Sequence, residues 1–250
     1  MILAIANQKG GVGKTTTAIN LGAGLGALER KVLLVDCDPQ GNATRGLGVP
    51  AESPHLYDAL TGATELAQCI RPSGFANLDL VAAQRDLVGV EVEFVGEPKW
   101  ETRLSDVLVE VSPRYDVVLL DCPPSLGHLT VNALTAAQAL VVPLQCEYFA
   151  LEGISELMAT VRRVQAGLNP KLTIAGILLT MYDDRTNLSK DVAEEIRAHF
   201  ADKVFETIVP RNVRLAEAPS HGLPIFQYDI KSRGAEAYLS LSRELLRRIS

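Results

Sequence analysis

The sequence has few cysteines, and this shortage excludes two classes of protein. Only four occur in 250 residues, and no two stand in a CxxC spacing. Neither a disulfide framework nor a zinc site is therefore indicated, and we expect small buried hydrophobic side chains at these positions. The four are Cys37, Cys69, Cys122 and Cys146.

Long hydrophobic runs are also missing. No apolar run reaches the roughly 18 residues that a membrane-spanning helix needs. The N-terminal stretch MILAIAN has no basic flank and leads into a glycine loop instead of a cleavage site, unlike a secretory signal. We therefore expect a cytoplasmic protein.

Excess positive charge is absent from the chain as a whole. The sequence has 24 Lys+Arg against 30 Asp+Glu, a net charge of -6, which by itself argues against nucleic-acid binding. The signs are unevenly distributed, because residues 1–184 carry 13 basic and 21 acidic side chains, whereas residues 185–250 carry 11 and 9. The last quarter is therefore the part where a basic surface can form.

Short apolar runs that alternate with helix-like stretches dominate the rest of the chain. The runs are rich in Val, Ile and Leu and mostly do not alternate with polar residues, as in strands buried on both faces. The alternation predicts an α/β fold with a doubly wound, mainly parallel sheet and helices on both faces. The expected strands are 2–7, 31–36, 77–83, 116–121, 139–145 and 172–180, and the expected helices are 14–28, 98–111, 128–138, 148–167, 187–200 and 232–249.

No linker, low-complexity tract or internal repeat interrupts the chain. With 47% apolar and 22% charged residues, residues 1–250 are predicted to form one domain. The region 41–74 is rich in turn residues, and we expect short helices and loops there, over one edge of the sheet.

The strongest motif, QKGGVGKTTT, lies between the first predicted strand and the first predicted helix. Glycines let backbone N–H groups curl around phosphate oxygens, and the helix N-terminus adds partial positive charge. Lys14 is expected to contact the β and γ phosphates, and Thr15 to hold Mg²⁺. The general pattern GxxxxGK[ST] has glycine where Gln8 stands and does not require Lys9. A dinucleotide motif GxGxxG fails, because Thr16 occupies its third glycine.

Carboxylates follow two of the predicted strands. Asp36 and Asp38 end the second strand, and Asp121 ends the fourth. An acid at a strand tip beside a phosphate loop can hold the water shell of a metal or position an attacking water. The three aspartates therefore complete the prediction of a nucleotide-hydrolysing site.

Together with the loop, further motifs resemble the ParA/Soj family of DNA-partitioning ATPases, within the deviant Walker A group of P-loop NTPases that also contains MinD. The resemblance runs from residue 2 to about 225 and implies an ATPase that uses ATP and Mg²⁺. No segment precedes the first strand, so the helix-turn-helix domain of longer members is expected to be absent. The motifs are KGGVGKTT, LLVDCDPQGNAT, LLDCPPSLG, QCEYFALEG, LLTMYDDRTNLS and PRNVRLAEAPSHGLPI.

The resemblance implies a role for Lys9, which in this family reaches the phosphates held by the partner subunit of an ATP-sandwich homodimer. Such a cation offsets the repulsion between two buried triphosphates. The resemblance also makes Asp38 the residue that positions the attacking water, whereas Asp36 is expected to support the site without touching the nucleotide or the metal. Asp38 and Asp121 are expected to bind the metal through water. The implied nucleotide contacts are Lys9, Gly10, Gly11, Val12, Gly13, Lys14, Thr15 and Thr16, with Pro210 and Asn212 against adenine.

The resemblance further implies non-specific binding of double-stranded DNA by the ATP-bound dimer. The family's DNA-contact positions fall on Arg185 and Arg214, inside the positively balanced last quarter. Slow hydrolysis stimulated by a ParB-type centromere-binding protein would reset the dimer, and the protein would associate with the nucleoid. Further candidate DNA contacts are Lys190, Arg211, Lys231 and Arg233.

Three other classes share parts of this pattern. A MinD-like membrane ATPase that positions the division site would use a basic amphipathic C-terminal helix, and the stretch 238–250 has that composition. An iron-sulfur relative would need cysteines at the dimer face, where Cys122 has no suitable companion. A metabolic ligase or kinase would need a separate substrate pocket, of which the sequence shows no sign. Partitioning remains the first hypothesis and the MinD-like function the alternative.

Overall fold

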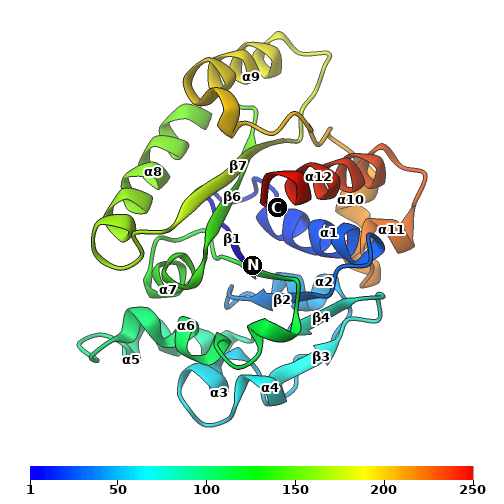
Figure 1. Ribbon diagram of the computed structural model, residues 1–250. Helices are drawn as coiled ribbons and strands as arrows, with labels where there is room; N and C mark the ends of the chain where they lie inside the picture. The colour runs from blue at the N-terminus through cyan, green and yellow to red at the C-terminus, as the bar shows by residue number, and fades with distance from the viewer. Residues whose placement is uncertain (250) are drawn as a thin grey trace.

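The computed structural model describes residues 1–249, and within them seven strands form one sheet (Figure 1). Their order across the sheet is β3-β4-β2-β5-β1-β6-β7. All neighbours are parallel except β3 and β4, which are antiparallel. The predicted α/β fold is therefore confirmed. The strands are β1 (Ile2–Ile5), β2 (Val32–Asp36), β3 (Ile70–Pro72), β4 (Leu78–Val81), β5 (Val117–Asp121), β6 (Ala139–Gln145) and β7 (Thr173–Thr180).

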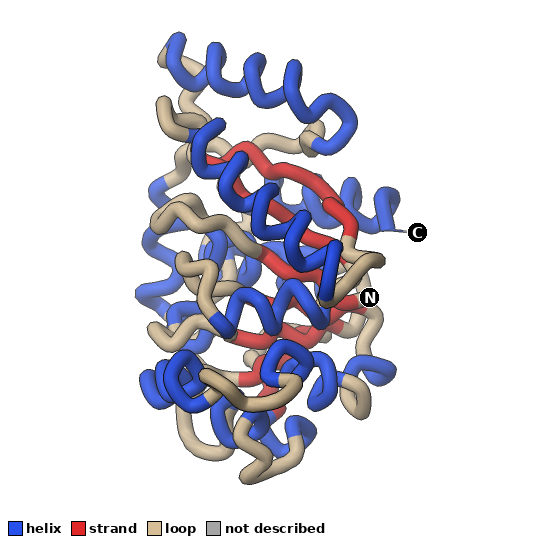
Figure 2. The backbone as a smooth tube through the Cα atoms, turned by 90° about the vertical axis from the view of Figure 1, so that its left-hand side faces the viewer, coloured by secondary structure: helices blue, strands red, loops and turns tan. Residues whose placement is uncertain are grey.

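Helices cover both faces of the sheet (Figure 1), and Figure 2 shows helices of one of these layers in front of the strands. One face carries α1 (Lys14–Ala27), α2 (Asn42–Gly46), α10 (Val213–Glu217), α11 (Ile225–Tyr228) and α12 (Arg233–Ile249). The other face carries α3 (Leu56–Leu60), α4 (Leu66–Cys69), α5 (Val90–Glu93), α6 (Arg103–Leu108), α7 (His128–Ala136), α8 (Ala150–Gly167) and α9 (Asn187–Phe200).

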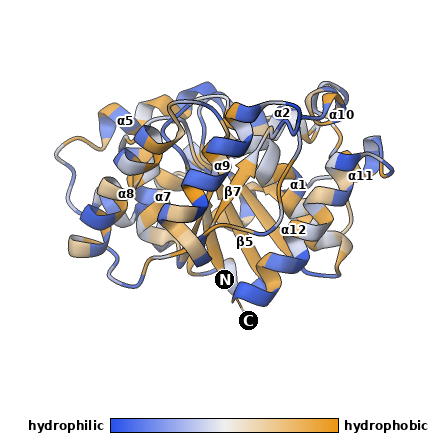
Figure 3. Ribbon diagram, turned by 90° about the horizontal axis from the view of Figure 1, so that it is seen from above, coloured by the Kyte–Doolittle hydropathy of each residue, from blue (hydrophilic) through white to orange (hydrophobic). Residues whose placement is uncertain are grey.

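The strands divide the core into two hydrophobic clusters, one on each face. In β1, Leu3 and Ile5 belong to the cluster under α1 and α12, whereas Ala4 belongs to the cluster under α7 and α8. Successive side chains of a strand point to opposite faces, so both faces must be apolar when both are covered. This explains the uninterrupted apolar runs of the sequence, which lie in the middle of the molecule (Figure 3). All four cysteines are buried free thiols, as expected.

Some predicted elements differ from the observed ones. The antiparallel edge strand β3 (Ile70–Pro72) lies inside the region expected to hold only short helices and loops, so Asp121 ends the fifth strand and not the fourth. The helix expected over 98–111 is shorter, because Lys99 has φ +58° and α6 starts only at Arg103, after a 3₁₀ turn. A left-handed residue cannot continue a right-handed helix.

The closing helix α12 is packed along its apolar face. Tyr238, Leu241 and Leu245 are fully or almost fully buried, and the Tyr238 hydroxyl lies 3.1 Å from the hydroxyl of Thr17 in α1. The face of α12 that a membrane would need is therefore already used by the core. Among residues 1–249, no helix is both long enough and apolar enough to cross a bilayer.

Candidate active site

The phosphate loop connects β1 to α1 at the carboxyl edge of the sheet. Gly11 has φ +75° and Gly13 has φ +88°, so glycine is needed at both positions for the turn. Gly13 is the N-cap residue of α1, and a glycine has no side chain with which to cap the N–H groups of that helix end. Asn7 fixes the start of the loop, because its Nδ2 donates to the Pro143 carbonyl (2.7 Å) and its Oδ1 accepts from the Lys9 amide (3.0 Å). The loop can therefore present N–H groups and a helix N-terminus to an anion.

Lys14, the first residue of α1, is buried at the base of this loop. Its ammonium donates to the Lys9 carbonyl at 3.0 Å. Burial lowers the pKa of Lys14, and nearby acidic groups, Asp121 first among them, act against that shift. An ammonium has three donors, so a buried one that gives a single hydrogen bond has donors left for phosphate oxygens.

Asp36 is the last residue of β2, and Asp38 lies two residues beyond it, in different surroundings. Asp36 is fully buried and accepts hydrogen bonds from the Thr44 amide and hydroxyl (2.8 and 2.7 Å) and from the Asp38 amide (3.2 Å). Burial raises the pKa of Asp36 to about 6, against the effect of these bonds. Asp38 borders a cavity and accepts from the Gln40 amide at 2.9 Å. Asp36 thus shapes the turn, whereas Asp38 faces the space in front of the loop.

Asp121 at the end of β5 lies beside Asp36 in register. Both of its carboxylate oxygens are buried and, within the described residues, neither has a hydrogen-bond partner. Burial raises the pKa of Asp121 well above its usual range, and Asp36 adds to the shift. The Thr15 hydroxyl is close enough to lower this pKa but does not meet hydrogen-bond geometry. A buried carboxylate without a partner is costly, so it marks a place where a cation would be stabilised.

A cavity of about 350 Å³ opens in front of the loop, and we call it the nucleotide cavity. Its size lies in the usual range for small-molecule sites, about 300–1,000 Å³. The glycine cradle, the buried ammonium and the unpartnered carboxylate fit a phosphate chain with Mg²⁺, for which Thr15 would be the direct protein ligand. The cavity is lined by Gly10, Gly11, Gly13, Lys14, Thr15, Thr16, Ile19, Asp38, Asn42, Pro124, Met181 and Pro219.

A second cavity, of about 270 Å³, adjoins the first and shares Gly13, Thr16 and Met181 with it. Pro210 and Asn212, the predicted adenine contacts, both line this second cavity. Asn212 also has a structural role, because its Oδ1 accepts from the Arg214 amide at 2.8 Å and caps α10. Its Nδ2 makes no hydrogen bond within residues 1–249, so the amide could still donate to a base.

Sequence reasoning missed two residues at the end of β7. The Thr180 hydroxyl donates to the Val12 carbonyl of the phosphate loop at 2.8 Å, in a buried setting. Met181 lines both cavities and has φ +50°, which is unusual for a residue with a side chain. The rule that ligands bind beyond the carboxyl ends of parallel strands could have pointed to both.

Lys9 lies at the edge of the site and is paired within its own chain. Its ammonium is 2.9 Å from the Glu147 carboxylate, and both side chains are partly exposed. Glu147 also accepts a hydrogen bond from Gln145, the last residue of β6. The next two residues, Tyr148 and Phe149, are 77% and 60% exposed and stack edge to face. The Lys9 ammonium is therefore held by a carboxylate of its own chain, and its role toward a partner stays a prediction.

The two arginines predicted to contact DNA lie outside both of these cavities. Arg185 follows β7 and forms a 2.7 Å ion pair with Asp183. Arg214 in α10 pairs with Glu217 (2.9 Å) and Asp229 (3.5 Å). We call Arg185 and Arg214 the arginine surface. The carboxylates that pair with them were not predicted from the sequence.

The parallel sheet, the strand–glycine loop–helix unit and the acids at the tips of β2 and β5 together define a P-loop NTPase. A family profile described as "AAA domain" matches residues 1–174, and the chain belongs to this family. Solved structures agree with this class. The chain is 38% identical, with a TM-score of 0.87, to cobyrinic acid a,c-diamide synthase from Mycobacterium smegmatis with bound ADP and magnesium, covering 99% of this chain and 94% of that one. It is 27% identical, with a TM-score of 0.79, to MinD from Pyrococcus horikoshii complexed with Mg-ADP, covering 98% and 95%.

Curated relatives identify the branch. The chain is 54% identical over 246 residues to the sporulation initiation inhibitor protein Soj of Bacillus subtilis, covering 98% of this chain and 97% of the relative. It is 53% identical over 249 residues to the chromosome partitioning protein ParA of Myxococcus xanthus, covering 99% and 88%. The chain is therefore a member of the ParA/Soj family of chromosome-partitioning ATPases, as the motifs predicted.

Proposed function

We propose that this chain is a DNA-partitioning ATPase in which ATP drives a sandwich dimer, the dimer binds duplex DNA without sequence specificity, and hydrolysis resets it. The observation that carries the proposal is the buried Asp121 carboxylate without a partner in the described chain, 0% exposed, beside the buried Lys14 ammonium. Within residues 1–249 Lys14 and Asp121 influence each other's pKa but form no ion pair, so phosphates would add negative charge beside Lys14 and Mg²⁺ positive charge beside Asp121. The electrostatics of the site would therefore change strongly when ATP binds.

Different residues of the site would bind Mg²⁺, the phosphates, the attacking water and the base. Mg²⁺ would be held by Thr15 and, through water, by Asp38 and Asp121, and when bound it would offset the charge of the β and γ phosphates. Lys14 would bind the phosphate oxygens, and Asp38, at the cavity wall, would orient the attacking water. Pro210 and Asn212 would contact the base.

Dimerisation would place Lys9 against the partner's phosphates. In this chain Lys9 is partly exposed, and a side-chain carbon at Gly10 would meet no atom of the described residues within 4 Å. The exposed pair of Tyr148 and Phe149 beside Glu147 gives the same edge an apolar surface. Open space at Gly10 in one chain is what a close approach of a second backbone would need, because a side chain there would otherwise keep the two apart.

DNA binding would follow from aligning two arginine surfaces. One subunit offers only Arg185 and Arg214 with family support, and two subunits double the number of phosphate contacts. A ParB-type centromere-binding protein would stimulate the slow hydrolysis and release the DNA. The protein would act in the cytoplasm, associated with the nucleoid.

Packing of α12 favours this function over the MinD-like alternative. A membrane-targeting helix must release its apolar face to lipid. In α12 that face is buried against α1, and Glu244 accepts from the Glu206 and Thr207 amides at 2.8 and 2.9 Å. Releasing α12 would therefore expose the core of the domain.

The substitution Gly10→Val tests the proposal. Because no atom of residues 1–249 outside the immediate neighbours lies within 4 Å of a Cβ placed at Gly10, the variant should fold and bind ATP like the parent. The added side chain should block the sandwich, so light scattering should show monomer with Mg-ATP, and retardation of duplex DNA should lose its ATP dependence. Normal ATP-dependent dimerisation and DNA binding by this variant would contradict the proposal.

A further inference from the structure

Arg185 is held by a carboxylate two residues before it. Its Nε donates to Asp183 Oδ1 at 2.8 Å, and its Nη2 donates to Asp183 Oδ2 at 2.7 Å. This bidentate pair uses one edge of the guanidinium, the same kind of edge that binds phosphate best. The Arg185 side chain is 81% exposed, whereas that of Asp183 is 18% exposed.

Asp183 is the fixed member of the pair. Its carbonyl accepts from the amide and the hydroxyl of Thr186, at 3.2 and 3.1 Å. The preceding residue, Tyr182, accepts from the Arg211 amide and donates to the Val209 carbonyl, which ties the segment to the neighbouring stretch of chain. The long, exposed arginine is therefore the member that would move when the pair opens.

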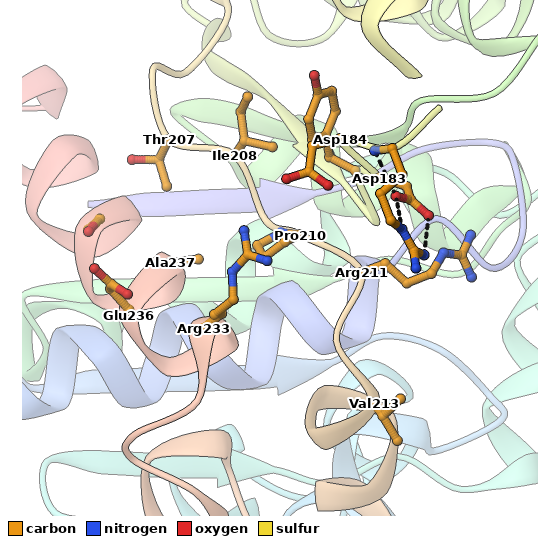
Figure 4. A pocket seen from close by; sticks show the side chains of 13 residues that line it. Asp183, Asp184, Thr207, Ile208, Pro210, Arg211, Val213, Arg233, Glu236 and Ala237 are labelled. Atoms are coloured by element: carbon orange, nitrogen blue, oxygen red, sulfur yellow. Dashed lines mark hydrogen bonds and ion pairs between the residues drawn. The ribbon is translucent and has the colours of Figure 1, made fainter. Parts of the chain in front are cut away.

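A groove of about 730 Å³ runs beside this pair (Figure 4). Three arginines and three acids line it, so its formal charges cancel: Arg185, Arg211, Arg233, Asp183, Asp184 and Glu236. Arg211 and Arg233 make no side-chain hydrogen bond or ion pair in the described part of the chain. Of these three arginines, Arg185 is the one bound to a carboxylate within residues 1–249, and this pairing lowers the pKa of Asp183 well below its usual range.

We propose that Asp183 is a built-in competitor of DNA phosphate for Arg185, which keeps the resting affinity of this surface for DNA low. The inference rests on the proposed function, because it needs Arg185 to contact DNA. A phosphate must either displace Asp183 or approach the remaining guanidinium edge next to a negative charge. Either route reduces the charge with which Arg185 displaces counterions from DNA.

Removal of the competing charge should strengthen binding in a measurable way. Since an exposed ion pair of this kind is weak, we expect Asp183→Asn to raise DNA affinity by about two- to five-fold for each subunit. The slope of log affinity against log salt should steepen by about 0.9 for each Arg185 that is set free. Asparagine keeps Oδ1 as an acceptor for the Arg185 amide, a bond of 3.1 Å, so the turn should be preserved.

The matched control is Asp184→Asn. Asp184 lies next in the chain and lines the same groove, but its carboxylate makes no hydrogen bond or ion pair within residues 1–249. Both substitutions remove one negative charge from the same surface, and only one of them releases Arg185. Fluorescence anisotropy with a duplex of random sequence, across a salt series, with Mg²⁺ and a non-hydrolysable ATP analogue, compares the two with the parent. Thermal melting establishes that each variant is folded.

A tighter and more salt-sensitive Asp183→Asn, with Asp184→Asn close to the parent, supports the inference. In the Arg185→Ala background, Asp183→Asn should then lose its advantage over Asp184→Asn. Equal gains by both variants would reduce the effect to general charge and overturn it, and weaker binding by Asp183→Asn would overturn it by showing that Asp183 orients Arg185 for DNA. If the parent shows no salt-sensitive DNA binding, the proposed function itself fails, a result distinct from the other two.

Discussion

The charged side chains of the nucleotide cavity and of the arginine surface differ in burial and in ion pairing. At the cavity, the Lys14 ammonium is buried, and the Asp121 carboxylate near it, which does not line the cavity, is fully buried and unpartnered in the described chain. On the arginine surface, Arg185 and Arg214 are largely exposed, and each already has a carboxylate within 2.9 Å. Buried charges without compensation gain much from a ligand, whereas exposed paired charges gain little each.

This contrast suggests how one ligand can control the binding of another. Binding at the cavity is expected to be strong for a single chain, because phosphates and Mg²⁺ compensate charges that burial has made costly. Binding at the arginine surface is expected to be weak for a single chain and to need several contacts at once. A dimer assembled around ATP supplies those contacts, so occupancy of the cavity would decide DNA binding.

The largest expected effect comes from Asp38→Ala in the nucleotide cavity. Without the group that orients water, ATP turnover should fall by about 100-fold or more. ATP-dependent dimerisation should persist, because Lys14 and the glycine loop are unchanged. Phosphate release and light scattering measure the two properties separately.

Asn42→Ala is the matched control, since Asn42 lines the same cavity without an acidic group. Its turnover at saturating ATP should stay within a few-fold of the parent. Normal phosphate release from Asp38→Ala would remove Asp38 from the hydrolytic role.

The next largest effect is expected from Asp121→Asn, which should stabilise the nucleotide-free protein against unfolding. The pKa of Asp121 in the folded chain is raised above the usual value of 3.8, so this group favours the folded state only at low pH and disfavours it as pH rises. Replacing the charge should therefore raise the free energy of unfolding of the nucleotide-free protein at pH 7 by about 1–3 kcal/mol. The gain should shrink toward pH 4.

Asp36 is present in both the parent and the Asp121→Asn variant, so its contribution to the pH dependence of stability should be the same in both. Because its folded pKa is about 6, both the parent and the variant should lose stability as pH rises from about 4 to 6. Urea unfolding across pH, with and without Mg-ATP, tests this, and stabilisation by Mg-ATP should be smaller in Asp121→Asn. A variant less stable than the parent at pH 7 would contradict the view that Asp121 is uncompensated.

The smallest of these three effects is expected on the arginine surface, from Arg214→Glu. Charge reversal should weaken duplex binding by about three- to ten-fold and flatten its salt dependence by about 0.9 for each DNA phosphate that Arg214 no longer binds. The Arg162→Glu variant, on an exposed position of α8 at the other face of the sheet, is the control for total charge. Salt-sensitive binding by Arg214→Glu equal to that of the control would exclude Arg214 from the DNA contacts.

Much of this architecture is predictable, because buried parallel strands leave a strong signal. The run 139–145 matches β6 residue for residue, and Asp36 and Asp121 are the last residues of β2 and β5, as expected. The edge strand Ile70–Pro72 was missed, since three residues with a proline carry little strand signal. The left-handed Lys99 that delays α6 has no clear mark in the sequence.

The pairings within the site were not predictable in the same way. Lys9 and Glu147 are 138 residues apart and meet only because β1 and β6 are neighbours in the sheet. The partners of Arg214 depend on how α10 and α11 fold back on each other, with Tyr228 donating to Glu217. Residue type and spacing in the sequence indicate the candidate functional residues, whereas the ion pairs that these residues form depend on tertiary packing.

Lys9 is the group through which ATP is expected to join two subunits. The most direct measurement is the solution mass of the Asp38→Ala chain with Mg-ATP, compared with the same chain carrying Lys9→Gln. The Asp38→Ala chain should have twice the 27.0 kDa mass of one subunit, and the Lys9→Gln variant should stay at one subunit while still binding ATP. An ATP-dependent dimer that forms equally well without the Lys9 ammonium would contradict this role.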